Sequence, residues 1–271
     1  MTLLTVQHLF IKDSWTNQTI VNDVNFTVDK GEVLGIIGES GSGKSVTCKA
    51  LVGLNPKRLN VEGTVTFNNV QMLTLSEMQL KKHRGKDIAM VMQQGSRAFD
   101  PSSTVGKQLV ETMKVHTQLS IQEIEATLTE YMDYMGLNNP KQILKSYPYM
   151  LSGGMLQRMM IALALALKPK LIIADEPTTS LDTITQYDVL QAFKGIKQHF
   201  DCAMIFISHD LTVINHIADR VVVMRKGQLI EEGTREAVLY QPQQAYTEYL
   251  LSTRKKVNDY FKSVLRGDSN A

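Results

Sequence analysis

Along the first part of the chain, hydrophobic and polar positions follow a pattern that predicts short strands. Alternation and β-branched residues in Thr5–Ile11 and in Ile20–Val28 indicate two strands, and the polar stretch Asp13–Gln18 indicates a turn between them. The continuous apolar run Val33–Ile37 indicates a strand that is buried on both faces. A glycine-rich stretch follows it, and helical spacing then extends over Lys44–Leu54. This region therefore predicts a strand–loop–helix unit after an initial pair of strands.

The pattern changes to helical spacing over Pro101–Tyr147, which contains no buried strand run. Strand-like runs return at Leu171–Ala174, Ala203–Ile207 and Arg220–Met224, each beside an amphipathic helical pattern. That alternation predicts an α/β fold with a mostly parallel sheet and helical crossovers, interrupted by a helical insertion. The segment Tyr246–Leu265 is amphipathic and basic, and it predicts a further helix.

Composition and charge restrict the class of protein. The 271 residues are 43% hydrophobic and 21% charged, and the net charge of +2 gives no electrostatic reason to expect nucleic-acid binding. Two cysteines, Cys48 and Cys202, are too few for a disulfide framework, so we expect a reducing cytosolic setting. We expect no secretory signal, and the longest apolar run, Met159–Leu167, is shorter than the roughly 20 residues that span a bilayer.

A motif of the form GxxxxGK[ST] follows the buried strand run. In such a loop, glycines turn backbone N–H groups toward phosphate oxygens, Lys44 reaches the β- and γ-phosphates, and Ser45 ligates Mg²⁺. A chance match occurs in about one in a hundred chains of this length, and here the motif stands between a strand and a helix, as its mechanism requires. We expect a nucleotide phosphate site formed by Gly38, Glu39, Ser40, Gly41, Ser42, Gly43, Lys44 and Ser45.

Two carboxylates follow the run Leu171–Ala174. Asp175 and Glu176 would stand at the carboxyl end of a parallel strand, where α/β proteins bind ligands. Beside a nucleotide, Asp175 is expected to hold the Mg²⁺ shell and Glu176 to polarise the attacking water. An isolated acidic pair would more often be a solvated turn. His209 ends another buried run, so we expect it to contact the γ-phosphate or water rather than to be purely structural.

A second anion-binding device precedes the helical pattern that extends to Leu167. Ser152, Gly153 and Gly154 would present N–H groups, a hydroxyl and the positive end of a helix dipole. A plain serine N-cap with flexible glycines explains the same residues equally well. One chain has no evident need for two phosphate sites, so the second site requires another explanation.

Taken in order, these motifs resemble those of the ATP-binding subunits of ABC transporters over nearly the whole chain. Gly38–Ser45 resembles the Walker A loop and Leu171–Glu176 resembles Walker B. Leu151–Met155 is similar to the LSGGQ signature, with Met155 in place of glutamine. The remaining matches are the Q-loop glutamine, the D-loop and the switch histidine: Gln93, Ser180-Leu181-Asp182 and His209.

The resemblance implies ATP as the nucleotide and assigns roles to single residues. Catalysis would involve Glu176, His209 and Gln93, and Mg²⁺ would be held by Ser45, Gln93 and Asp175. The implied fold is a P-loop ATPase with a mostly parallel sheet, an antiparallel β subdomain and an inserted helical subdomain. The expected divisions are an ATP-binding core over 1–95 and 155–235, a helical subdomain over 96–154 and a C-terminal helical tail over 236–271.

In this family two ATPase subunits pack head to tail, so each ATP lies between one subunit's Walker motifs and the other's signature. Ser152, Gly153, Gly154 and Met155 would then act on ATP bound to a partner, which accounts for the second anion site. The implied assembly is peripheral at the cytoplasmic face of the cell membrane. It contains a second ATPase in a heterodimer, two transmembrane permeases and an extracellular solute-binding lipoprotein. Residues near the permeases' coupling helices would include Arg97, Phe99 and Asp100.

Two segments narrow the resemblance. Ser152–Arg158 and Ala245–Leu251 are similar to the oligopeptide, dipeptide and nickel importer subfamily, and the chain resembles in particular the D-type ATPases of staphylococcal importers that use a staphylopine-type metallophore for nickel and cobalt. Oligopeptide or dipeptide import is the alternative. A non-transport ABC ATPase acting on ribosomes or DNA is disfavoured, since the chain has one ATPase unit and no sustained heptads. Six scattered histidines give no reason to expect a transition-metal site.

Some features depart from the subfamily or stay open. Gln94-Gly95 stands where an acidic residue and proline are common, so the local backbone is expected to differ. No cysteine-rich C-terminal extension is present, so no iron–sulfur cluster is expected. Trp15, the only tryptophan, is the candidate for stacking on adenine, with Phe10 a weaker one, although ordinary packing explains Trp15 nearly as well.

Overall fold

The N-terminal strands form an antiparallel sheet. The structure is a computed structural model that describes residues 1–93, 95–179, 181–199 and 202–253. The strand order is β2-β1-β4-β5, and the edge strand β5 is only two residues long. Inward and outward side chains alternate along β2, as expected for a sheet with one solvated face. The four strands are β1 (Thr2–Asp13), β2 (Thr19–Asp29), β4 (Leu59–Phe67) and β5 (Val70–Gln71).

A six-stranded sheet forms the centre of the molecule, with the order β10-β9-β3-β8-β7-β6. Five of its strands are parallel, and β10 joins β9 antiparallel at one edge. Every residue of β3, β7 and β8 is buried, which agrees with their unbroken apolar sequences. The six strands are β3 (Val33–Ile37), β6 (Ile88–Val91), β7 (Leu171–Asp175), β8 (Ala203–Ile207), β9 (Arg220–Arg225) and β10 (Gln228–Thr234).

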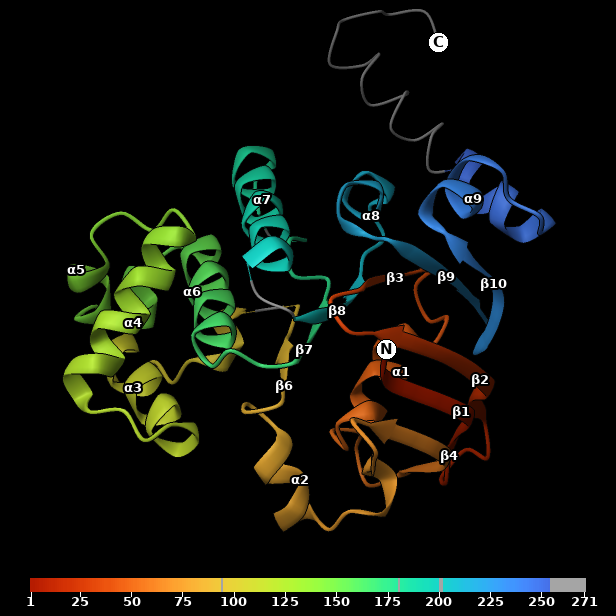
Figure 1. The fold of residues 1–271 in the computed structure, drawn as a ribbon, viewed down its shortest axis with the longest axis horizontal. Coiled ribbons are helices and arrows are strands. Elements are labelled where there is room, and N and C mark those ends of the chain that lie inside the picture. Colours follow the sequence, from red (N-terminus) through yellow and green to blue (C-terminus); the bar gives the residue numbers. More distant parts are fainter. Residues whose placement is uncertain (94, 180, 200–201, 254–271) are drawn as a thin grey trace, which may run out of the picture.

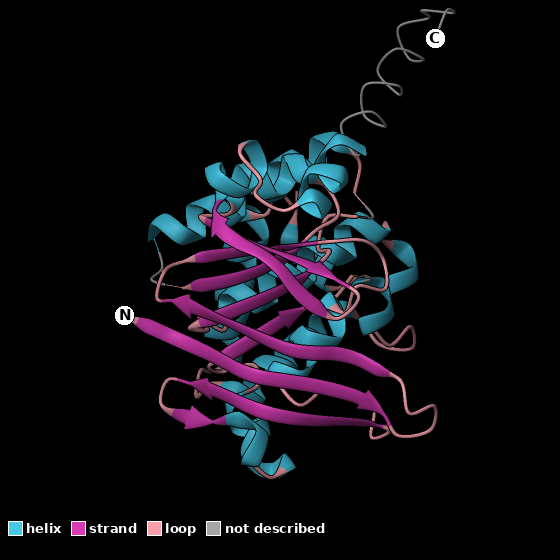
Figure 2. Ribbon diagram, turned by 90° about the vertical axis from the view of Figure 1, so that its right-hand side faces the viewer, coloured by secondary structure: helices cyan, strands magenta, loops and turns pink. Residues whose placement is uncertain are grey.

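The two faces of this sheet are covered by different layers. On one face, side chains of β3, β7 and β8 pack with the antiparallel sheet and with α1 (Lys44–Leu51). On the other face, alternate side chains of the same strands pack with helices. Figure 2 shows the strands of the antiparallel sheet facing the viewer, with helices behind and above them. The helices of the second layer include α6 (Gly153–Ala166), α7 (Thr183–His199) and α8 (Leu211–Ile217).

The middle of the chain forms the predicted helical insertion. The described residues between Pro101 and Tyr147 contain three α-helices and no strand: α3 (Val105–His116), α4 (Ile121–Tyr134) and α5 (Pro140–Leu144). Ser120 and Glu123 form a capping box that begins α4. Figure 1 shows these helices on one side of the molecule (left), away from the antiparallel sheet (right), with α6 between them and the central sheet.

Several elements were absent from the sequence-based prediction. They are strands β4, β5, β6 and β10, helix α2 (Glu77–His83), and the short 3-10 turns η1 (Met72–Thr74), η2 (Gly95–Ala98) and η3 (Pro148–Met150). Helix α9 (Arg235–Tyr240) lies at the start of the segment for which a helical tail was predicted. The prediction that the helix after the glycine-rich loop extends to Leu54 was wrong. It ends at Leu51 because Gly53 adopts a positive φ of 63° and the chain turns back, with Leu54 N–H donating to Lys49 O.

The C-terminal part of the chain packs back on the core. Residues 245–253 are helical, and the side chains of Tyr246 and Leu250 are buried in the helical layer. The rest of the predicted Tyr246–Leu265 helix lies outside the described residues. In the part that the structure describes, no helix is both long and apolar enough to cross a membrane. The division into core, helical subdomain and tail stays a prediction.

Candidate functional site

The glycine-rich loop connects β3 to α1 and lies against β9. Gly38 has a φ of 151°, and a Cβ there would lie 2.2 Å from the backbone oxygen of Met224. Gly43 has a φ of 101° and is the N-cap of α1. Because a side chain would be strained at both positions and would overlap backbone at Gly38, the motif's glycines are needed for the path of the chain. The loop thus brings the N-terminus of α1 to the carboxyl edge of the central sheet.

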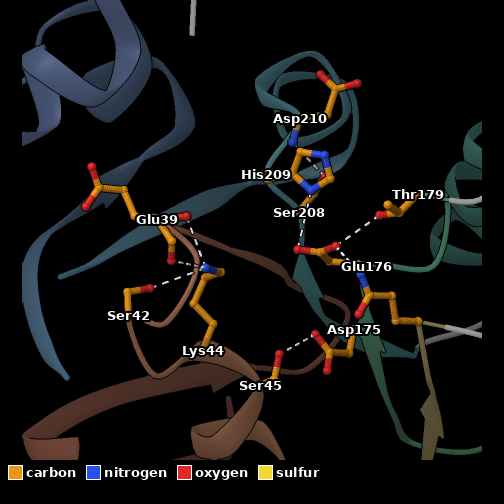
Figure 3. Close-up of polar contacts among 12 residues, drawn as sticks. Glu39, Ser42, Lys44, Ser45, Asp175, Glu176, Thr179, Ser208, His209 and Asp210 are labelled. Carbon is orange, nitrogen blue, oxygen red and sulfur yellow. Dashed lines mark hydrogen bonds and ion pairs between the residues drawn. The ribbon is translucent and has the colours of Figure 1, made fainter. Parts of the chain in front are cut away.

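Lys44 is held inside this loop. Its side chain is buried, and Nζ donates to the backbone oxygens of Gly38 at 3.0 Å and Glu39 at 2.8 Å and to Ser42 Oγ at 3.3 Å. Figure 3 shows the ammonium group pointing toward these loop atoms. A buried ammonium has to be satisfied by acceptors, and phosphate oxygens offer stronger acceptors than carbonyl oxygens do. The cation is therefore positioned to receive a phosphate group.

Ser45 and Asp175 form the next pair. Ser45 Oγ donates to Asp175 Oδ1 at 2.8 Å, joining the start of α1 to the end of β7. Burial raises the pKa of the Asp175 carboxyl above its ordinary value, and the hydrogen bond from Ser45 partly offsets this. A hydroxyl and a carboxylate beside a phosphate-binding loop are hard oxygen donors of the kind that Mg²⁺ takes together with nucleotide phosphates. The donor set therefore fits Mg²⁺.

Glu176 lies at the centre of a polar cluster. Gln93 Nε2 donates to its Oε2 at 2.8 Å, Thr179 Oγ1 donates to the same oxygen at 3.1 Å, and His209 Nδ1 lies 3.3 Å from its Oε1. Figure 3 shows the carboxylate between Thr179 and His209. Glu176 itself has a φ of 48°, unusual for a residue with a side chain, while its N–H donates to Ile207 O at 3.0 Å. Such backbone strain is commonly kept at functional sites.

The cavity that these groups surround has a volume of about 500 Å³. Asp175 is absent from its described lining, which includes Lys44, Ser45, Gln93, Glu176, Thr179 and His209. The cavity brings together most of the predicted phosphate loop with the predicted Gln93, Glu176 and His209. Three further lining residues were missed by sequence reasoning: Ile20, Val46 and Thr179. Only Thr179 carries polar chemistry, and its position three residues after Glu176 was the one signal that could have found it. A larger hollow of about 1150 Å³ lies among α3, α4 and α5, but none of the predicted catalytic residues lines it.

The signature residues lie outside that cavity. Ser152 Oγ accepts a hydrogen bond from Met155 N at 3.2 Å, so it caps α6. A Cβ at Gly153 would meet nothing within 4 Å, while one at Gly154 would lie 3.2 Å from Leu181 Cδ2. Ser152, Gly153, Gly154 and Met155 are all absent from the described lining of the cavity. The N-terminus of α6 therefore contributes nothing to the described lining of this cavity.

Other predicted residues have structural contacts. Asp182 caps α7, accepting from Thr185 N at 3.0 Å and from Thr185 Oγ1 at 2.7 Å. Asp100 accepts from Ser102 N and Oγ, which lowers the pKa of its carboxyl. Phe99 packs against the main core. Ser180, Gln94 and the side chain of Arg97 lie outside the described part of the chain.

Trp15 lies in the turn between β1 and β2 and does not line the described cavity. Its side chain is 79% exposed, and the guanidinium of Arg58 lies 5.4 Å from its ring centroid. The ring thus packs against Arg58 and stays exposed, and its stacking on adenine remains a prediction. Phe10, the weaker contender, lies on β1 and is 36% exposed.

Comparison with known proteins gives consistent matches. The sequence profile described as ABC transporter matches residues 21–179. The chain is 76% identical over 268 residues to the metal-staphylopine import system ATP-binding protein CntD of Staphylococcus aureus (strain NCTC 8325 / PS 47), covering 99% of both chains. It is 41% identical to the oligopeptide transport ATP-binding protein OppD of Bacillus subtilis, covering 86% of this chain and 66% of that one.

Solved structures agree on the fold. A dimeric ATP-binding cassette in a post-hydrolysis state, bound to ADP and phosphate, matches with a TM-score of 0.78 and 26% identity, over 86% of this chain and 99% of that one. A component of the cbiONQ transporter complex from Clostridium perfringens matches in fold, with a TM-score of 0.73 and 24% identity, over 89% of this chain and 91% of that one.

Proposed function

The chain belongs to the ABC transporter family of ATP-binding proteins, and from this premise we propose that its ATP hydrolysis powers the import of nickel and cobalt as complexes with a staphylopine-type metallophore. The observation that carries the proposal is the 76% identity to CntD over 99% of both chains. Identity to the oligopeptide relative OppD is 41%, and this difference favours metal–metallophore import over the oligopeptide alternative. Similarity over the whole chain supports the choice of solute. No single residue can do so, because the solute does not touch an ATPase subunit.

The residues of the cavity, together with Asp175 beside Ser45, supply the parts that ATP hydrolysis needs. Backbone N–H groups of the loop and the ammonium of Lys44 bind the phosphates. Ser45 and Asp175, with Gln93, would hold Mg²⁺, which when bound neutralises charge on the phosphate oxygens. These groups stabilise and orient the triphosphate while leaving its γ-phosphorus open to attack.

Glu176 is proposed as the base. Its carboxylate takes a proton from a water molecule as the water oxygen forms a bond to the γ-phosphorus and the bond to the ADP oxygen breaks. Gln93, Thr179 and His209 hold the carboxylate in place through the contacts described above. His209 is also proposed to contact the γ-phosphate.

A complete site is proposed to need a second subunit. Ser152, Gly153, Gly154 and Met155 would act on ATP bound to the partner, because they do not line the described cavity of their own chain. The proposed assembly is a heterodimeric ATPase bound to two permeases at the cytoplasmic face of the membrane, served by an extracellular lipoprotein. The exposed ring of Trp15 is proposed to stack on adenine.

Reconstitution into proteoliposomes with the co-purifying permeases tests this function. We expect ATP hydrolysis and ⁶³Ni uptake to rise when the metallophore complex and the solute-binding lipoprotein are supplied. An oligopeptide mixture with the same lipoprotein is the matched control. Stimulation by peptides alone would assign the chain to the oligopeptide alternative, and co-purification with ribosomes in place of permeases would overturn a transport role.

A further inference from the structure

Gln157 is a buried polar side chain that the proposed mechanism does not use. It lies in the second turn of α6 and is 0% exposed. Its amide is satisfied from both ends: Oε1 accepts from Gly95 N at 2.6 Å, and Nε2 donates to Met92 O at 3.1 Å. A buried amide requires such partners, and here both belong to the backbone of one short loop.

The two partners lie on either side of Gln93. One side chain of α6 therefore fixes the backbone before and after the residue whose amide donates to Glu176 at 2.8 Å. Gln157 itself is absent from the described lining of the ATP cavity. Its contacts reach the catalytic carboxylate only through the loop and the side chain of Gln93.

The close approach of α6 to this loop also explains Gly95. A Cβ there would lie 2.6 Å from Gln157 Oε1 and 2.8 Å from Gln157 Cα. The second of these atoms is helix backbone, which a rotamer change cannot move away. Gly95, which departs from the pattern common in the subfamily, thus gives the glutamine amide room to reach the chain on both sides of Gln93.

We propose that Gln157 is a positioning residue, which ties the loop to α6 so that Gln93 holds Glu176 in place. The inference rests on the proposed ATPase function and on Glu176 as its base. Because the N-terminus of α6 carries Ser152, Gly153 and Gly154, the same side chain links the surface offered to a partner's ATP with the carboxylate that acts on this chain's own ATP. A movement of α6 is then transmitted to the loop through the two hydrogen bonds of Gln157, and from the loop to Glu176 through the hydrogen bond from Gln93.

A double-mutant cycle separates positioning from simple packing. We compare ATP hydrolysis by the full-length chain in its assembled transporter for the wild type, Gln157→Ala, Gln93→Ala and the double variant. Gln157→Ala should lower kcat about tenfold and leave KM for ATP within about twofold, because the residue does not line the cavity. In the Gln93→Ala background the same substitution should cause no further loss of kcat.

Controls keep the result decisive. Gln122→Ala, an exposed glutamine on α4, should leave kcat unchanged. Gln157→Met keeps the buried volume and loses both hydrogen bonds, so it separates loss of the contacts from loss of packing. Should Gln157→Ala not fold, the cycle with Gln157→Met decides in the same way. Wild-type hydrolysis that Glu176→Gln abolishes establishes the ATPase activity, with Glu176 as its base, independently of Gln157. Given that result, an equal fall of kcat in both Gln93 backgrounds would overturn the positioning role alone.

Discussion

The hydroxyl of Ser45 and the carboxylate of Asp175 lie 2.8 Å apart although 130 positions separate them in the chain. The contact joins the first turn of α1, the helix after the phosphate loop, to the last residue of the buried strand β7. Burial raises the pKa of Asp175 despite this hydrogen bond. The carboxylate that we propose as a ligand of Mg²⁺ is therefore an unfavourable charge for the fold that holds it.

Replacing Asp175 with Asn should stabilise the nucleotide-free protein while abolishing hydrolysis. The folded-state pKa is raised, so the folded protein binds the proton more tightly, and stability is lost as pH rises from the ordinary carboxyl range through the raised pKa. The amide that replaces the carboxylate carries no charge, so Tm should rise at about pH 8, by about 2–4 °C for each kcal/mol relieved.

The gain in Tm should shrink as pH falls into the range in which both forms are neutral. Differential scanning calorimetry at several pH values measures it. Asp133→Asn, at an exposed position on α4, is the control and should show no such pH-dependent gain. A lower Tm for Asp175→Asn at about pH 8 would contradict the stated cost of the buried charge.

Glu176→Gln should retain ATP binding and lower kcat about 10²–10⁴-fold, because the amide cannot accept the water proton. The binding contacts at Lys44 and Ser45 stay intact in this variant. Equilibrium binding of a fluorescent ATP analogue and a phosphate-release assay measure the two effects. Glu130→Gln on α4 is the matched substitution at an exposed site. Near-normal turnover would remove Glu176 from the role of base.

Gly38→Ala should destabilise the protein more than Gly41→Ala does. Both positions have positive φ, which costs about 1 kcal/mol for a residue with a side chain, but only at Gly38 does the new Cβ overlap backbone, 2.2 Å from Met224 O. The overlap should add about 1–3 kcal/mol. Urea unfolding measures the difference, and equal stabilities of the two variants would contradict it.

Gly153→Asp should fold normally and yet prevent productive dimers. A side chain at this position meets nothing within 4 Å, and an acidic residue in the first turn favours the helix. The new charge would repel the phosphates of ATP bound to a partner. We expect unchanged Tm and unchanged ATP binding by the chain itself, with loss of ATP-driven association in sedimentation velocity. Association as strong as in the wild type would place the signature outside the shared site.

Sequence patterns located the core strands better than the edges. Val33–Ile37 and Ala203–Ile207 were predicted with the bounds that the structure gives, because both are apolar at every position and buried on both faces. Strands β4 and β10 were missed because most of their residues are exposed or half-buried, so no apolar period marks them. The local sequence gives little indication of a strand whose formation depends on pairing with adjacent strands of the sheet.

The site shows the same division. Motif spacing predicted Lys44, Asp175 and Glu176 as site residues, because local sequence marks each of them. Lys44 belongs to the glycine-rich loop, and the two carboxylates stand at the end of an apolar strand. The hydrogen bonds from Gln93 to Glu176 and from Gly95 to Gln157 join segments far apart in the chain, and only packing of α6 on the central sheet brings them together. No periodicity in the sequence encodes such a meeting.

The order of strands has a consequence for how the protein is made. β3, which precedes the phosphate loop, pairs with β8 on one side and with β9 on the other. Both neighbours are synthesised after residue 200. A chain emerging from the ribosome therefore exposes its Walker A sequence before the hydrogen-bonded strands that shape it exist, and the nucleotide pocket is completed only after β8 and β9 have been synthesised.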